Sequence, residues 1–110
     1  MTGSRARPRD TATAIETFLD MMSAERGASQ NTLAAYRRDL LDFAGYMKAS
    51  SFTQATREDV KAYLRGLSRS GLAGSSQARR LSALRQYFSF AYGEGLRTDD
   101  PTDAVDAPRR

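Results

Sequence analysis

The sequence predicts an all-α protein, a compact bundle of four main helices with room for a short fifth helical turn near the C-terminus. Its three prolines, Pro8, Pro101 and Pro108, lie near the chain ends and leave a long interior free of helix breakers. Apolar residues recur at spacings of three and four along four segments, and none of the segments alternates as a strand would. Short glycine-containing stretches separate the segments, at Gly27, Gly71, Gly74, Gly93 and Gly95. Helices with such short connections pack as bundles.

The first helix is expected to begin near Thr11 or Thr13, after a flexible basic arm at residues 1–10. Glu16 follows Thr13 by three residues, which is the spacing of a capping box. Gly27 is a suitable C-terminal stop. The predicted apolar stripe of this helix consists of Ile15, Phe18, Leu19 and Met22.

The second helix is expected to begin between Ser29 and Asn31 and to run for about four turns. Residues 49–55 then read as a loop that tucks Phe52 into the core. The buried face of the helix is predicted from apolar residues at alternating spacings, namely Leu33, Tyr36, Leu40, Phe43 and Met47.

The third helix is expected to open at Thr56, because Asp59 stands three residues further on and supports the N-terminus. Gly71 ends this helix. Its buried side is predicted to consist of Val60, Tyr63, Leu64 and Leu67.

A fourth helix follows, capped by Ser75 or Ser76 and ended by the glycines at positions 93 and 95. Small and polar residues occupy its first turn, and arginines come next. Its apolar stripe is predicted as Ala78, Leu81, Leu84, Phe88 and Ala91, with Tyr87 and Tyr92 beside it.

The C-terminal tail is expected to turn at Asp100 and Pro101, and residues 102–105 are expected to form one short helical turn. Residues 107–110 read as the start of a linker to a further domain. The helical domain is therefore predicted to cover residues 11–106.

Composition excludes several classes of function. The chain has 110 residues, 40% hydrophobic and 27% charged, a balance typical of one soluble globular domain. No apolar run approaches the roughly 18 residues of a membrane span, and the first ten residues lack the apolar core of a secretory signal. The sequence has no cysteine and no histidine, which excludes disulfides, the usual zinc ligands and histidine-based catalysis. We expect a cytoplasmic protein without a cofactor, a metal site or a membrane partner.

Positive charge is concentrated in one part of the chain. The formal net charge is +4, and most of the basic residues are arginines. Residues 57–92 hold seven basic and two acidic residues, whereas residues 93–110 hold three basic and five acidic residues. Arginine makes forked contacts with phosphate and with guanine, so this distribution favours a nucleic-acid partner. A net charge of this size is also common on solvated surfaces.

The predicted fourth helix has the pattern of a helix that lies in a major groove. Its first turn offers unpaired N–H groups and the positive end of the helix dipole, which suit a phosphate, beside the hydroxyls of Ser75 and Ser76. Arg79 and Ala83 are expected opposite the apolar stripe, with Arg80 on its flank. A solvated basic face on a core helix accounts for these residues equally well.

The second helix has the same design in weaker form. Asn31 and Thr32 lead it, and Arg37 and Arg38 follow one turn later. Taken alone, this pattern is better explained by an N-cap and an ion pair between Arg38 and Asp42.

The tyrosines are interpreted as packing residues, because no histidine is present to activate them as nucleophiles. The acidic pairs are interpreted as cap and turn residues.

Several stretches in one order resemble a known family. Residues 31–40 (NTLAAYRRDL), residues 75–88 (SSQARRLSALRQYF), and the opening IETFL at 15–19 resemble the N-terminal, core-binding, SAM-like domain of the tyrosine recombinases, the phage-integrase and Xer group. The closing DDP at 99–101 and APR at 107–109 resemble the junction to the catalytic domain. The resemblance covers about residues 13–110, and DDP favours the XerD branch over XerC.

The resemblance implies a role in DNA recombination. In this family the small domain and the catalytic domain form a clamp around a DNA half-site, and two helices of the small domain face the major groove. The catalytic arginines, lysine, histidines and tyrosine belong to the catalytic domain, whose motifs are absent here, so this chain is not expected to be an enzyme. The implied DNA-binding residues are Asn31, Thr32, Ala35, Arg37, Arg38, Ser75, Ser76, Arg79, Arg80 and Ala83.

The same resemblance implies the partners. They are a double-stranded half-site, the protein's own catalytic domain and a XerC-like recombinase, with which the full protein would cut and rejoin DNA to resolve chromosome dimers before cell division. Two alternatives stay open. The first is that the same domain belongs to an integrase of a phage or mobile element. The second is that it is a helical protein–protein interaction module, a role in which SAM-like folds also serve.

Overall fold

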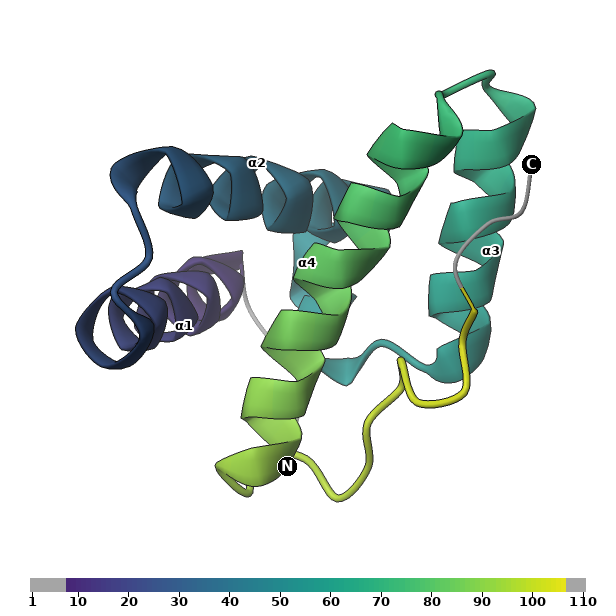
Figure 1. Cartoon of the computed structure of the whole chain (residues 1–110). Coiled ribbons are helices and arrows are strands. Elements are labelled where there is room, and N and C mark those ends of the chain that lie inside the picture. Colours follow the sequence, from purple (N-terminus) through teal and green to yellow (C-terminus); the bar gives the residue numbers. More distant parts are fainter. Residues whose placement is uncertain (1–7, 107–110) are drawn as a thin grey trace. The chain divides into compact units, whose positions relative to one another are not determined.

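The computed structural model describes residues 8–106, and their regular structure is entirely helical (Figure 1). No strand occurs among these residues, so the prediction of an all-α protein with four main helices is confirmed. The chain divides into two compact units, one ending at Ala55 and the other beginning at Thr56. In chain order the helices are α1 (Pro8–Arg26), α2 (Gln30–Tyr46), the 3-10 helix η1 (Ala49–Gln54), α3 (Arg57–Arg69) and α4 (Gly74–Gly93).

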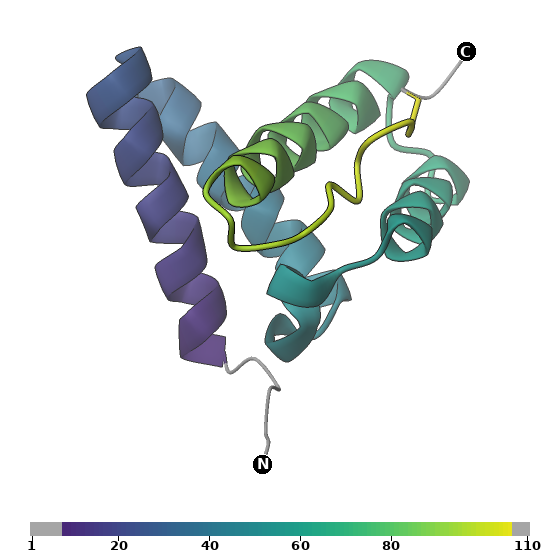
Figure 2. The ribbon, with the colours of Figure 1, turned by 90° about the horizontal axis from the view of Figure 1, so that it is seen from below.

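The first unit is held together by mutual contacts among α1, α2 and η1. Helices α1 and α2 lie side by side, as Figure 2 also shows. Phe18, Phe43 and Phe52 are fully buried, and the rings of Phe43 and Phe52 meet edge to face with their centroids 6.1 Å apart. Burial of each such ring contributes about 1.5–3 kcal/mol. Phe52 is therefore in the core as expected, although its segment forms a 3-10 helix where a loop was predicted.

The start of α1 differs from the prediction. The helix begins at Pro8, which lacks the N–H that a first turn leaves unpaired. Thr13 consequently lies inside the helix, and its predicted capping box is wrong, because Glu16 instead pairs with Arg37 of α2. Residues 8–10, which were expected in the basic arm, are helical. Residues 1–7 lie outside the described part of the chain.

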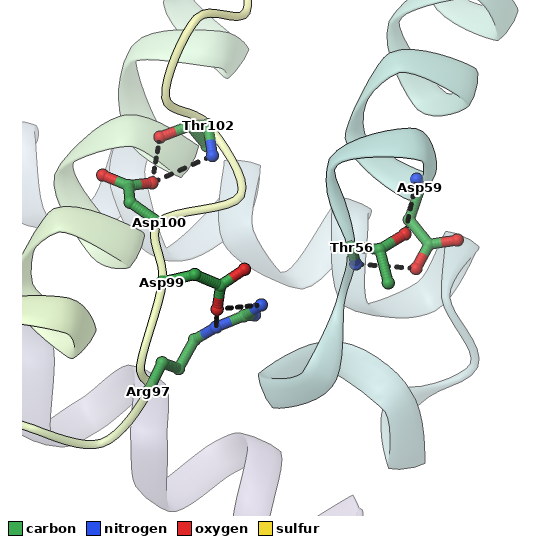
Figure 3. A network of polar contacts seen from close by, with 6 residues as sticks. All are labelled: Thr56, Asp59, Arg97, Asp99, Asp100 and Thr102. Carbon is green, nitrogen blue, oxygen red and sulfur yellow. Dashed lines mark hydrogen bonds and ion pairs between the residues drawn. The ribbon is translucent and has the colours of Figure 1, made fainter.

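The second unit opens with the capping box that the sequence predicts at Thr56 (Figure 3). The Asp59 backbone N–H donates to Thr56 Oγ1 at 3.1 Å, and the Thr56 backbone N–H donates to Asp59 Oδ2 at 2.8 Å. Two donors that the helix end would leave unpaired are thereby satisfied. Val60, Tyr63 and Leu64 of α3 are buried, as expected.

Replacement of Thr56 by Ala is expected to lower the free energy of unfolding by about 1 kcal/mol, because it removes the cap acceptor. Urea unfolding followed by circular dichroism measures this loss. Thr13→Ala is the matched control: it carries the same sequence pattern but sits within α1, so it should change the free energy of unfolding by no more than about 0.5 kcal/mol. Equal losses in the two variants would contradict the assignment of the caps.

The start of α4 also differs from the prediction. The N-cap is Ala73, which makes no side-chain cap bond, and Ser75 and Ser76 lie within the first turn. The prediction that one of these serines caps the helix is therefore wrong. The preceding turn is held by Gln77, whose side-chain amide donates to the carbonyl oxygen of Leu72 at 2.7 Å. The cap moves upstream because this bond and the Gln77 backbone bond to Ala73 close the helix earlier.

Two glycines end the helices of this unit. Gly71 and Gly95 have φ values of 85° and 75°, a region that side chains with a Cβ rarely occupy. The backbone N–H groups that follow them, on Leu72 and Leu96, reach back to carbonyl oxygens of α3 and α4 at 3.3 and 2.9 Å. Both predicted stops are confirmed.

The segment after α4 turns back towards α3 (Figures 1 and 2). Arg97 pairs with Asp99 at 3.1 Å (Figure 3), and its guanidinium lies over the ring of Phe88, 5.2 Å from the ring centroid. Asp100 Oδ1 accepts from both the backbone N–H and the hydroxyl of Thr102. Residues 101–104 form hydrogen-bonded turns, so the expected fifth helical turn is absent. The predicted linker at 107–110 lies outside the described residues.

Tyr87, expected beside the apolar stripe, is buried in the core of this unit. Burial raises its pKa from 10.0 to about 12, and the positive charge of Arg97 opposes this rise. A spectrophotometric titration of the chain should therefore show a late tyrosine step that Tyr87→Phe removes. Tyr87 loses its proton near pH 10 in the unfolded chain but only near pH 12 in the folded chain. The free energy of unfolding should therefore fall as the pH rises from 10 to about 12. Titration of all the tyrosines near 10 would contradict the burial.

Candidate nucleic-acid interface

The outward face of α4 carries part of the predicted site. Ser75 and Arg79 are exposed, and Ser76 is half-buried. Each residue turns an α-helix by about 100°, so Ser75, Arg79, Ser82 and Gln86 fall along one side. This side faces away from the buried Leu81, Leu84 and Phe88.

Ala83 does not belong to that outward face. It is 0% exposed, so its predicted position opposite the apolar stripe is wrong. The opposite error applies to Ala78, which was expected in the stripe and is exposed. The physical reason is the width of the buried arc, which runs past the stripe to include Ala83 and Tyr87 on one side. Alanine fits either environment, so its identity does not report on which side of the arc it lies.

Arg80 is placed against α3. Its Nη1 donates to the hydroxyl of Tyr63 at 3.1 Å, and the side chain is half-buried. A guanidinium held in this way joins the two helices of the unit and leaves fewer of its donors for a ligand. The structure thus separates two neighbouring arginines that the sequence pattern treats alike, with Arg79 outward and Arg80 inward.

The outward face of α2, in the first unit, carries the rest of the predicted residues. Asn31 and Arg38 are exposed, and Ala35 is half-buried. The first turn is already capped, because Ser29 Oγ accepts from the backbone N–H of Thr32 at 3.1 Å and donates to its hydroxyl at 3.0 Å. Among the predicted residues of α2, Asn31 and Arg38 are thus the exposed polar side chains that a ligand can reach.

Arg37 forms an ion pair with a residue of α1. Its Nε and Nη2 donate to the two carboxylate oxygens of Glu16 at 2.8 and 2.9 Å, a forked pair across two helices. The hydrogen bonds and charge of Arg37 lower the pKa of Glu16, and Glu16 raises the pKa of Arg37. The pair is exposed, so its contribution to stability is small and is lost as the pH falls through the lowered pKa of Glu16. Arg37 therefore ties α1 to α2.

The middle of the second unit carries charge of one sign only. Between Asp59 and Glu94 the chain has six basic residues and no acidic residue. Three of the six, Arg79, Arg80 and Arg85, belong to α4. Arg85 donates to the carbonyl oxygen of Val105 and so anchors the C-terminal segment. The other three lie on α3 and received no role from the sequence patterns.

Neither a metal-binding cluster nor a membrane-spanning helix is found within residues 8–106. The described residues contain no group of three or more acidic side chains arranged to hold a metal ion. None of their helices has the length and apolar character needed to span a bilayer.

Comparison with known proteins gives a family and close relatives. Residues 15–95 match the family described as phage integrase, N-terminal SAM-like domain. The chain is 52% identical over 102 residues to the tyrosine recombinase XerD of Rhizobium meliloti (strain 1021), covering 91% of this chain and 33% of the relative. It is 50% identical over 112 residues to that of Agrobacterium fabrum (strain C58), covering 100% of this chain and 34% of the relative. No solved structure matches the chain.

The similarity extends to more distant relatives and has the same limit in length. The XerD of Caulobacter vibrioides is 45% identical over 96 residues, which is 86% of this chain and 32% of the relative. The chain thus spans about one third of the length of the curated relatives it matches. The family match includes α2, α3 and α4, which carry all the candidate residues, and it confirms the resemblance seen in the sequence. The chain therefore belongs to the family of phage integrase N-terminal SAM-like domains.

Proposed function

We propose that this chain is the DNA-binding N-terminal domain of a XerD-like site-specific tyrosine recombinase, and that it grips one recombination half-site through the major groove as half of a clamp. The observation that carries the proposal is the outward face of α4, which presents Arg79 beside an uncapped, serine-bearing first turn. No acidic residue occurs anywhere in this helix to repel a phosphate.

The chemistry of α4 suits a duplex. Its first N–H groups have no partner within the helix and no capping side chain, so they can donate to a phosphate at the positive end of the helix dipole. The hydroxyls of Ser75 and Ser76 can donate to the same group. Arg79, one turn further along, has the length and the fork to reach a base edge. On α2, Asn31 and Arg38 would add polar contacts.

The wider role rests on the family. The catalytic domain of the full protein would supply the nucleophilic tyrosine, and the protein would cut and rejoin DNA through a covalent phosphotyrosyl intermediate. With a XerC-like partner it would resolve chromosome dimers in the cytoplasm. This chain's contribution to that reaction is to hold the half-site in register.

A fluorescence-anisotropy titration tests the proposal. The chain is titrated against a labelled duplex carrying a Xer-type recombination site, and against scrambled DNA, at several salt concentrations. If about five phosphates are neutralised, the logarithm of the association constant should fall with the logarithm of salt at a slope of about −4 to −5. A preference for the site would support base reading, whereas a slope near zero would refute DNA binding.

A helical protein–protein interaction module is the second candidate. It is favoured by one observation, the exposure of two large apolar side chains near the end of α4, Tyr92 at 55% and Leu96 at 64%. This function predicts a slope near zero in the same titration. It also predicts that charge reversal at Arg79 leaves the main activity intact.

A further inference from the structure

The basic residues of α3 stand at a regular spacing of four. Arg57, Arg65 and Arg69 are exposed and Lys61 is half-buried, and we name the four together the α3 ladder. We propose that the α3 ladder is a second DNA-binding surface, which holds the phosphate backbone of a duplex without reading its bases. This inference rests on the proposed function and extends it from α4 to a helix that the sequence patterns left without a role.

The geometry of the ladder matches an extended polyanion. A step of four residues advances an α-helix by about 6 Å and turns it by only about 40° beyond a full turn. The ladder therefore runs about 18 Å along the helix, a length over which one strand of a duplex presents about five phosphates. At about 100° per residue, the buried Val60, Tyr63 and Leu64 lie at least about 100° round the helix from Arg65 and Arg69, which leaves these two arginines to solvent. The other two ladder residues, Arg57 and Lys61, lie nearer the edge of the buried side.

The charges of the ladder are not neutralised by the protein. Among residues 8–106, none of the four ladder side chains forms an ion pair, whereas Arg37 and Arg97 both do. Of the two acidic residues of α3, Asp59 is committed to the cap of Thr56, and Glu58 lies in the first turn, where the helix dipole favours it. The remaining turns of the helix carry positive charge only.

A solvated face would be expected to mix its charges. Helix α1 does so, with Glu16, Asp20, Glu25 and Arg26 on its exposed residues. Like charges four residues apart destabilise a helix, so the ladder carries three unfavourable neighbouring pairs in the isolated chain. A bound phosphate backbone would remove this repulsion, and it would release counterions from the DNA.

The position of the ladder favours DNA over an acidic protein. Helices α3 and α4 contact one another within the second unit, and the short connection at residues 70–73 joins the C-terminal end of α3 to the first turn of α4 (Figure 1). Arg65 and Arg69 are thus at the same end of this unit as Ser75 and Arg79. A duplex held by the first turn of α4 would therefore pass near the Arg65 and Arg69 end of the ladder.

The test compares two double variants with equal loss of charge. Arg65→Gln/Arg69→Gln neutralises two ladder positions with a good helix former. Arg26→Gln/Lys48→Gln removes the same charge from exposed positions of the first unit. Each chain is titrated against the recombination-site duplex and against scrambled duplex over a range of salt concentrations. The ladder variant should lose about 2 units of salt slope, roughly 0.9 for each cation, and its preference for the recombination site should not change.

The outcomes separate this proposal from the one on which it rests. If the wild-type chain binds DNA and the ladder variant keeps the slope of the control, the ladder proposal is wrong, and an acidic protein becomes the better partner. If the wild-type slope is itself near zero, the proposed function fails first.

A measurement that needs no variant is NMR of the Arg65 and Arg69 Nε–Hε groups. Added scrambled duplex should shift their signals, and unchanged signals would overturn the proposal.

Discussion

Charge reversal at Arg79 is expected to weaken binding of the half-site duplex about ten- to a hundredfold. Arg79 lies on the outward face of α4, and a forked arginine contact to a base contributes about 1–3 kcal/mol of discrimination. The salt slope should also become shallower, because a cation that faces the duplex is replaced by an anion. The free energy of unfolding should change by no more than about 0.5 kcal/mol, since the side chain is exposed. Anisotropy titration and urea unfolding measure the two quantities.

Arg80→Met is the informative comparison for this variant. Arg80 donates to the hydroxyl of Tyr63, so its replacement should reduce stability and leave the salt slope unchanged. Methionine retains the apolar part of the side chain, which limits the loss to the polar contact. If Arg79→Glu and Arg80→Met lowered the slope equally, the division of the two arginines into outward and inward would be wrong.

Phe88→Ala should cause the largest loss of stability, about 3–5 kcal/mol. Phe88 is 0% exposed, and its ring meets that of Tyr87 edge to face with centroids 4.9 Å apart. The guanidinium of Arg97 covers the same ring, so truncation also removes a cation–π contact that holds the C-terminal segment. A protein of this size has a total stability of about 5–15 kcal/mol, so the variant should be partly unfolded at 37 °C.

Urea unfolding by circular dichroism measures this loss, with Phe90→Ala as the control. Phe90 is half-buried on the same helix, and its truncation should cost less. Where the Phe88 variant still folds, the pKa of Tyr87 should fall from about 12 towards 10.0, because a cavity beside its ring admits water. A loss of less than 1 kcal/mol for Phe88→Ala would contradict the central place of this ring.

Thr13 and Thr56 illustrate how far local sequence signals reach. Both threonines are followed by an acidic residue three positions later, and both were expected to cap a helix. Only Thr56 does so, because the chain upstream of it leaves the helical conformation. Thr13 lies within a helix that begins at Pro8, and Glu16 pairs with Arg37, 21 residues away in the sequence. A three-residue pattern contains no information about such a distant partner.

The candidate site shows the same limit. The sequence led correctly to the outward position of Arg79, because it lies about 180° from the centre of a long apolar stripe. It misplaced Ala83, whose small apolar side chain fits both surfaces, and it did not separate Arg80 from Arg79. It counted the basic residues of α3 without recognising their four-residue spacing as a surface.

The sequence by itself determined the all-α class, the four helices, most of their ends and the family, because these follow from spacing, glycine and proline positions and a set of ordered strings. Tertiary structure decided how wide the buried arc of α4 is, which arginines are tied to Glu16 and Tyr63, and which stay exposed. The physical reason is the distance along the sequence over which each effect acts. Helix formation depends on residues three or four apart, whereas burial and ion pairing depend on side chains that only the folded chain brings together.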